Sequence, residues 1–191
     1  MADVTNILVG AVNVYVAPVG TAPPDEDDNP LVWTGWTNVG YTDGGVELEY
    51  SPDYSDHFVD QETGPVKTTL TQESATLRAP MAEATLQNLN RVISASSFSQ
   101  VVAASGVTGK DILKVGSGTP AEVAVGFEGK SPENFWRLFI GWRALVVGAV
   151  GQAYRKDEKL IFPAEYRLNV DSTKTAGERL FRMVDMTAAA L

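Results

Sequence analysis

The fold is decided by the stretch GYTDGGVELEY at residues 40–50, which opens with a glycine-rich turn and continues as an alternating run. Val46, Leu48 and Tyr50 occupy every second position, and glutamates stand between them. This two-residue period predicts a β-strand over residues 46–50 with one buried face and one polar face. The strand begins a unit of turn, strand, excursion, strand and helix.

A second strand of this unit is predicted over residues 66–79, and it ends at Pro80, which cannot donate to a ladder. Leu70 and Leu77 lie at opposite parity, so we expect either a β-bulge or a change of pairing partner near Glu73. The residues between the two strands, about 51–66, are acidic and form a long excursion rather than a tight turn. Long ordered excursions are uncommon and tend to be functional, so we expect this one to be an arm.

A helix that lies on the sheet is predicted over residues 81–93, because its apolar side chains recur at helical spacing. Serine, alanine and glycine dominate about residues 94–120, which favours a flexible loop, and residues 20–30 are a loop by composition. Alternating or continuous apolar runs predict further strands over residues 7–19, 31–39, 122–128, 135–147, 160–170 and 180–186. We therefore expect residues 1–191 to form a single mainly β domain, a β-sandwich or partly open β-barrel with one α-helix packed against it.

Composition limits the classes of function. The formal net charge is −9, from 15 Lys and Arg against 24 Asp and Glu, and binding to phosphates needs the basic clusters that this chain lacks. The absence of cysteine excludes disulfides, thiol catalysis and cysteine-ligated zinc. The most apolar run, residues 135–150, contains arginines and is too short for a membrane span, and the first residues lack the basic stretch of a secretory signal.

The candidate catalytic and metal-binding residues are few. His57 is the only histidine and lies in the excursion, which is a poor place for the held geometry that catalysis needs. His57 with Asp53, Asp56 and Asp60 has metal-ligand chemistry, but no spacing places the four on one face, so solvated loop charge is the preferred interpretation. We assign no catalytic residue, no metal site and no cofactor, and we expect the protein not to be an enzyme.

Three segments of the chain carry a family resemblance: Gly40-Tyr41-Thr42-Asp43-Gly44-Gly45-Val46, Thr68-Thr69-Leu70-Thr71-Gln72-Glu73 and Glu83-Ala84-Thr85-Leu86-Gln87-Asn88-Leu89. Together with the strand and excursion between them, they resemble the major tail tube proteins of long-tailed, siphovirus-like bacteriophages. The resemblance covers about residues 5–95. The C-terminal half fits the family in its length and in its strand-rich pattern.

The resemblance implies hexameric rings of sandwich-like subunits, whose strands join a continuous β-barrel around a lumen and which stack into a tube that carries phage DNA. The implied partners are further copies of the chain, the tape measure, tail tip and terminator proteins, and DNA that passes without specific binding. The implied location is the virion tail, after assembly in the cytoplasm of the bacterial host. No cofactor is implied.

Within this picture, three groups of residues are candidate functional sites. Glu47 and Glu49, on the polar face of their strand, are predicted to face the lumen, where acidic groups repel phosphate. Arg137 and Arg143 are predicted either to pair with carboxylates at a subunit contact or to lie at the core rim. The arm is predicted to dock on an adjacent ring or subunit through Asp53, Tyr54, Asp56, His57, Phe58, Asp60, Gln61 and Glu62.

Two alternatives remain open at this point. The chain could be a β-sandwich binding module, an adhesin or a carbohydrate-binding domain, with Trp33, Trp36, Trp136 and Trp142 as stacking platforms for sugars. It could also be a tail terminator or neck protein built on the same fold.

Overall fold

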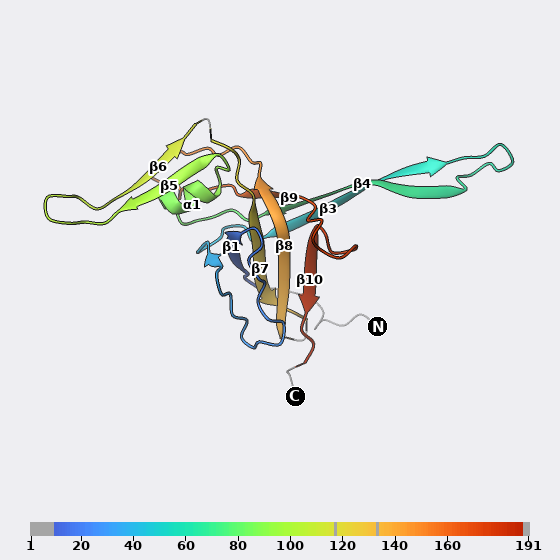
Figure 1. Ribbon diagram of the computed structural model, residues 1–191, viewed down its shortest axis with the longest axis horizontal. Helices are drawn as coiled ribbons and strands as arrows, with labels where there is room; N and C mark the ends of the chain where they lie inside the picture. The colour runs from blue at the N-terminus through green and yellow to red at the C-terminus, as the bar shows by residue number, and fades with distance from the viewer. Residues whose placement is uncertain (1–9, 117, 133, 189–191) are drawn as a thin grey trace.

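The computed structural model describes residues 10–116, 118–132 and 134–188, and it is mainly β with one short helix (Figure 1). The elements are β1 Asn13–Pro18, β2 Thr37–Asn38, β3 Glu47–His57, β4 Lys67–Arg78, α1 Leu86–Arg91, β5 Ser96–Val101, β6 Lys110–Val115, β7 Val123–Lys130, β8 Trp136–Val146, β9 Glu165–Leu168 and β10 Phe181–Asp185. This confirms the predicted fold class, a mainly β sandwich-like fold with one helix.

Eight strands form one antiparallel sheet in the order β2-β1-β7-β8-β9-β4-β3, with β10 attached to β8. β8 is long enough to serve two partners along one edge. Its residues 137–141 pair with β10, and its residues 144–146 pair with β9. Among the described residues the sheet does not close into a barrel. Val46, just before β3, and Val12, just before β1, nevertheless line the same small pocket.

The two faces of β8 belong to two apolar layers. Phe139 is fully buried in the larger layer, which α1 and the segments beside it cover, and which also holds Leu77 of β4 and Tyr166 of β9. Ile140 points to the opposite face, as strand alternation requires, and belongs to a smaller layer with Trp36. The sheet is therefore covered on both faces around β7 and β8.

The segment over residues 19–36 covers the smaller layer, and a buried carboxylate fastens it. Glu128, 8% exposed, accepts hydrogen bonds from Tyr15 Oη at 2.8 Å, Trp33 Nε1 at 2.7 Å and Asn13 Nδ2 at 3.0 Å. The Trp33 ring stacks on Tyr15 with 4.1 Å between centroids. Burial, and then the hydrogen bond to Glu128, raise the pKa of Tyr15 to about 12. The predicted loop over residues 20–30 is confirmed.

The glycine-rich turn before β3 has a steric cause. Gly40 has φ 84°, a conformation that L side chains rarely adopt. A Cβ there would lie 2.2 Å from the carboxylate of Glu83, whose Oε1 accepts the Tyr41 N–H at 3.0 Å. The quoted turn is thus closed by a residue that follows β4.

The predicted helix over residues 81–93 was too long, since α1 comprises only Leu86–Arg91. Met81 instead exchanges backbone hydrogen bonds with Phe162, with an N–O distance of 2.9 Å in each direction, which holds it in extended conformation. Thr85 then caps the helix by accepting the Asn88 N–H at 3.1 Å. The buried Met81 contributed to the helical periodicity without belonging to a helix.

The predicted flexible loop over about residues 94–120 was also wrong, because β5 and β6 pair there as a hairpin from Ser96↔Val115 to Val101↔Lys110. Most of its side chains are exposed on both faces, so no apolar alternation marked it. In Figure 1 this hairpin projects from the end of the molecule opposite to the β3–β4 hairpin.

The remaining strand predictions hold with shifted or shorter bounds. β7 covers most of the predicted 122–128 and continues to Lys130, while β8 and β10 lie within the predicted 135–147 and 180–186. Of the predicted 160–170 only Glu165–Leu168 is a strand, and of the predicted 31–39 only Thr37–Asn38. β1 starts at Asn13, and residues 7–9 of the first predicted strand lie outside the described residues.

Gly126→Ala tests the close packing under the covering segment. A Cβ at Gly126 would lie 2.7 Å from Trp33 Cζ3 and 3.0 Å from the Phe139 carbonyl oxygen, so the indole or the strand must shift. We expect the free energy of unfolding to fall by about 1–3 kcal/mol in urea titrations. Gly151→Ala, with nothing within 4 Å of its added methyl group, is the matched control. Equal stability of the two variants would contradict the packing described.

Candidate functional site

The most conspicuous feature of the molecule is a long β-hairpin, here called the arm, formed by β3 and β4 (Figure 1). The two strands pair from Glu47↔Arg78 to His57↔Lys67. Only residues 75–78 of β4 also pair with β9. Beyond that point the arm is a two-stranded sheet that projects from the body, and both of its edges lack a partner strand among the described residues.

The arm corrects the predicted excursion over residues 51–66. β3 continues through residue 57, and only residues 58–66 connect the strands. The strand was missed because both faces are open to solvent, so polar residues occupy positions of both parities. Pro52 is compatible with it because β3 is an edge strand. The candidate arm residues divide into Asp53, Tyr54, Asp56 and His57 on β3, and Phe58, Asp60, Gln61 and Glu62 in the connection.

The predicted bulge is present on the arm. Asp53 pairs with Gln72 and Tyr54 with Leu70, so Thr71 is the extra residue on β4, two positions from the predicted Glu73. The bulge resolves the parity conflict between Leu70 and Leu77 noted in the sequence. Both leucines consequently point to the same face of the hairpin.

One face of the arm continues the apolar face of the body. Tyr50, Tyr54 and Leu70 follow Leu48 and Leu77 on the same face by strand register. Inside the body this face packs into the large apolar layer, but Tyr54 is 64% exposed and no described element covers it. On this face of the arm the exposed apolar side chains are interrupted by Glu73 and by the Asp56–Thr68 pair, and the isolated chain leaves them in water.

The connection at the end of the arm is apolar and acidic at once. Phe58, Val59 and Val66 are exposed there. Residues 51–74 carry five carboxylates against one lysine, a formal net charge of −4. These two properties together suit a contact with a surface that is apolar at its centre and basic at its rim.

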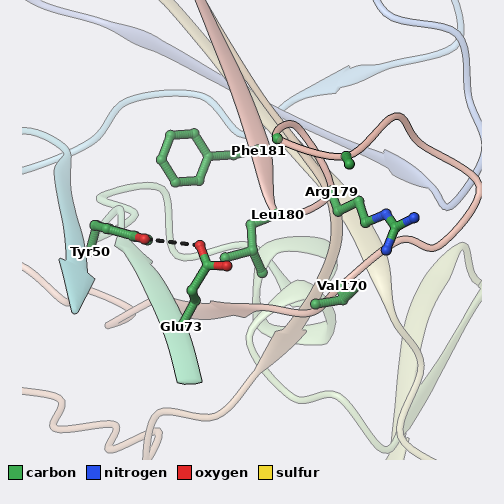
Figure 2. Close-up of a pocket in the computed structure, with 8 residues that line it drawn as sticks. Tyr50, Glu73, Val170, Arg179, Leu180 and Phe181 are labelled. Carbon is green, nitrogen blue, oxygen red and sulfur yellow. Dashed lines mark hydrogen bonds between the residues drawn. The ribbon is translucent and has the colours of Figure 1, made fainter. Parts of the chain in front are cut away.

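A pocket of about 450 Å³ lies where the arm leaves the body (Figure 2). Tyr50 Oη donates to Glu73 Oε2 at 2.9 Å, and the opposite wall comes from the segment that leads into β10. Figure 2 shows Phe181, Leu180 and Val170 on that wall, with the Arg179 side chain beside them. A carboxylate that holds a tyrosine, facing apolar side chains, offers no nucleophile with an adjacent base.

The candidate lumen residues lie at the base of the arm. Arg78 Nη1 lies 3.4 Å from a carboxylate oxygen of each of Glu47 and Glu49, and its Nε lies 3.6 Å from Glu165. The Glu47 carboxylate is the largest cause that raises the pKa of Arg78. Three carboxylates thus share one guanidinium on an uncovered polar face, and the cluster has a formal net charge of −2.

The two candidate interface arginines both have carboxylate partners within the chain. Arg137 on β8 makes two hydrogen bonds to Asp185 on β10, of 2.5 and 2.6 Å. Arg143 donates through Nε to Glu122 at 2.9 Å and also through Nη2. Each pair fixes neighbouring parts of the sheet, and a role at a subunit contact stays a prediction.

The four tryptophans proposed as sugar-stacking platforms make contacts within the body of the protein. Each indole N–H donates within the chain: Trp33 to Glu128, Trp36 to the Ala22 carbonyl, Trp136 to Asn29 and Trp142 to the Glu178 carbonyl. Ammonium groups of Lys130 and Lys174 lie 3.9 Å from the centroids of the Trp136 and Trp142 rings. These contacts give the binding-module alternative no support.

Few side chains suited to catalysis or metal binding lie near one another in the part of the chain that the structure describes. His57 Nε2 lies 3.0 Å from Thr69 Oγ1 on the arm. Over residues 10–116, 118–132 and 134–188, no three acidic or histidine side chains gather in a way that could hold a metal ion. In those same ranges, no helix has the length and apolar character needed to cross a membrane.

Sequence reasoning missed two surface features, the β5–β6 hairpin and the pocket at the arm base. The hairpin had a weak signal in the sequence, because the apolar residues Phe98, Ile112 and Leu113 interrupt an otherwise polar and small-residue stretch. No local signal existed for the second, because Tyr50 and Phe181 are far apart in the chain and meet only through the sheet order.

The described residues thus form a β body with two projecting hairpins, both of which expose apolar side chains. The family model for phage tail tube proteins matches residues 1–154, which is most of the chain, and the chain therefore belongs to that family. The family has a structural role in the phage tail. A comparison with curated proteins found no match.

The Arg143–Glu122 pair predicts a pH dependence of stability. Hydrogen bonds from Arg143, and then from Asn169, hold the pKa of Glu122 below its ordinary value. A depressed pKa in the folded state contributes stability above the unfolded pKa, and this contribution is lost as pH falls through the folded value. We expect Glu122→Gln to be less stable than the wild type at pH 7, with the difference closing below about pH 4.

Urea titrations of both proteins between pH 7 and pH 3 measure this difference. Glu158→Gln, which removes an exposed ion pair with Arg155, is the control and should change stability by less than about 0.5 kcal/mol throughout. A gap between wild type and Glu122→Gln that is independent of pH would count against the pairing.

Proposed function

We propose that the chain is the major subunit of a phage tail tube, in which hexameric rings stack around a lumen through which DNA leaves the virion. The observation that carries this proposal is the uncovered apolar face of the arm. The covered apolar face of the body continues onto the arm, where its apolar side chains are exposed, and we infer that another chain covers them. In a tail tube protein, that chain is a further copy.

The free edges of the sheets support ring formation. β3 is the last strand of the large sheet, and the β5–β6 hairpin forms a sheet of its own with two edges. Unpaired edges invite association, and closing them in a ring removes them from solvent. The projections at opposite ends of the molecule in Figure 1 favour a head-to-tail contact between copies, because each end presents a different surface.

The polar face at the base of the arm is our candidate for the lumen wall. Glu47 and Glu49 project from it, and the shared Arg78 neutralises only part of their charge. An acidic wall disfavours phosphate and lets DNA pass without sticking, since attraction to phosphates sets nonspecific affinity. Further partners of the tube are the tape measure, tail tip and terminator proteins, and assembly takes place in the cytoplasm of a bacterial host.

Replacing residues 54–71 by Asn-Gly tests the arm. The replacement shortens the hairpin to the Asp53↔Gln72 pair and closes it with a type I′ turn, so the body keeps its strands. We expect a folded monomer, with wild-type circular dichroism in the body and no tubes in negative-stain electron microscopy. Tyr154→Ala, at an exposed residue far from the arm in the sequence, serves as the control. Normal tubes from the shortened protein would refute the docking role.

Glu47→Lys with Glu49→Lys tests the lumen. Both side chains are largely exposed, so folding and assembly should be nearly unchanged. DNA delivery, measured as plaque titre of phage that carry the variant, should fall by about 10-fold or more as the wall gains attraction for phosphate. Asp157→Lys with Glu158→Lys makes the same change in net charge elsewhere. An equal loss in both variants would point to total charge rather than to a lumenal position.

A further inference from the structure

We propose that the receptor for the arm is a groove beside the β5–β6 hairpin of a second copy, so that the connection at the end of one arm lies against Leu86, Val102, Ala103 and Lys110 of the next subunit. This inference rests on the proposed function, because it needs copies that assemble. It adds the surface that receives the arm, which the tail tube assignment alone leaves open.

The groove is an open depression with both apolar and polar lining residues. It measures about 570 Å³ and lies between the start of α1 and the two strands of the hairpin. Ala103 and Gly109 lie close together, since a Cβ on Gly109 would lie 3.2 Å from the Ala103 nitrogen. Leu86 and Val102 also line the groove, and Val102 is 79% exposed. These exposed apolar side chains can pack against an apolar side chain of a second copy.

The arm offers side chains that fit this groove. Phe58, the first residue after β3, is 66% exposed, and Val59 follows it. Six of the 17 large apolar side chains that are exposed in the described residues lie on the arm, and four lie on or beside the β5–β6 hairpin. The two projections thus concentrate the apolar surface that the isolated chain leaves in water, and each gains cover from the other.

The charges of the two projections are complementary. Residues 51–74 of the arm have a formal net charge of −4, whereas residues 96–115 carry two lysines against one aspartate in a chain that is acidic overall. That aspartate, Asp111, accepts a hydrogen bond from Gln100 Nε2 at 3.1 Å. Lys110 and Asp111 both line the groove, and Asp60 and Glu62 follow Phe58 and Val59 on the arm. Attraction between these groups orients the contact.

The geometry makes this contact one between different copies. The arm and the β5–β6 hairpin project from opposite ends of the molecule, so an arm faces away from the groove of its own chain (Figure 1). One copy's arm meets the next copy's hairpin, and repetition of this heterologous contact gives a ring when the rotation closes.

The pocket at the arm base is the competing receptor. It also has apolar walls, and its charged lining residues are Glu73, which belongs to the acidic arm itself, and Arg179 (Figure 2). The groove is likewise lined by one cation and one anion, Lys110 and Asp111, so local charge does not separate the two sites. The groove lies beside the hairpin that projects opposite to the arm, where a head-to-tail contact needs a receptor, whereas the pocket lies at the base of the arm, and we therefore assign the arm to the groove.

Paired cysteines test the contact cleanly, because the wild-type chain contains no cysteine. Thr63→Cys places a thiol at the end of the arm and Ala103→Cys places one in the groove. Tubes of the double variant are treated with a short bis-maleimide and run on denaturing gels. We expect a ladder of cross-linked chains, and only monomers from tubes of either single variant.

Thr63→Cys with Ala176→Cys reports on the competing pocket. A ladder from this pair, with none from Thr63→Cys with Ala103→Cys, overturns the inference while leaving the tube intact. Tubes that cross-link with neither pair overturn it as well. If wild-type protein forms no tubes even with a tail-tip nucleus, the proposed function fails, and the inference fails with it.

A charge exchange gives a second, independent measurement. Asp60→Lys with Glu62→Lys, and separately Lys110→Glu with Lys114→Glu, should each raise the concentration needed for tube assembly by about 10-fold. The protein with all four changes should return to within about 3-fold of the wild type, because the attraction is restored with its sign reversed. Assembly of the fourfold variant that is no better than that of either parent contradicts the contact.

Discussion

The rest of the structure depends on one constraint: an apolar sheet face must be covered, and this chain covers only part of its own. Around β7 and β8 both faces are packed, one under α1 and one under the segment that Glu128 fastens through Trp33 and Tyr15. Along the arm the same face runs into solvent with Tyr54 and Leu70. Burial of apolar surface is the main favourable term in association, so the uncovered part is where a second chain gains most.

Cross-strand ion pairs connect the parts of the body from which these projections arise. Ion pairs from Arg137 and Arg143 connect β8 to Asp185 on β10 and to Glu122 before β7, and Arg78 ties β3, β4 and β9 together. A body with two different ends is the geometry that the proposed head-to-tail contact requires, because each copy would supply one surface and receive the other. The chain belongs to the phage tail tube family, which has a structural role in the phage tail.

The sequence was sufficient for features that depend on local spacing. The alternation of Val46, Leu48 and Tyr50 gave the first strand of the arm, and the opposite parity of Leu70 and Leu77 gave the bulge. It failed where polar residues occupy both faces of a strand, as along residues 51–57 and in β5 and β6. It also failed at Met81, where burial comes from a bridge to Phe162 rather than from a helix.

By itself, then, the sequence determined a mainly β fold, an acidic chain without cysteine, and a resemblance to tail tube proteins carried by residues 40–89. Only the tertiary structure decided that the excursion is a paired arm, that a second hairpin stands at the opposite end, and that Glu47 and Glu49 share Arg78. The physical reason is that solvent-exposed strands are stabilised by backbone hydrogen bonds to a partner strand. Many different polar sequences can make those backbone hydrogen bonds, so the types of the side chains do not indicate where an exposed strand lies.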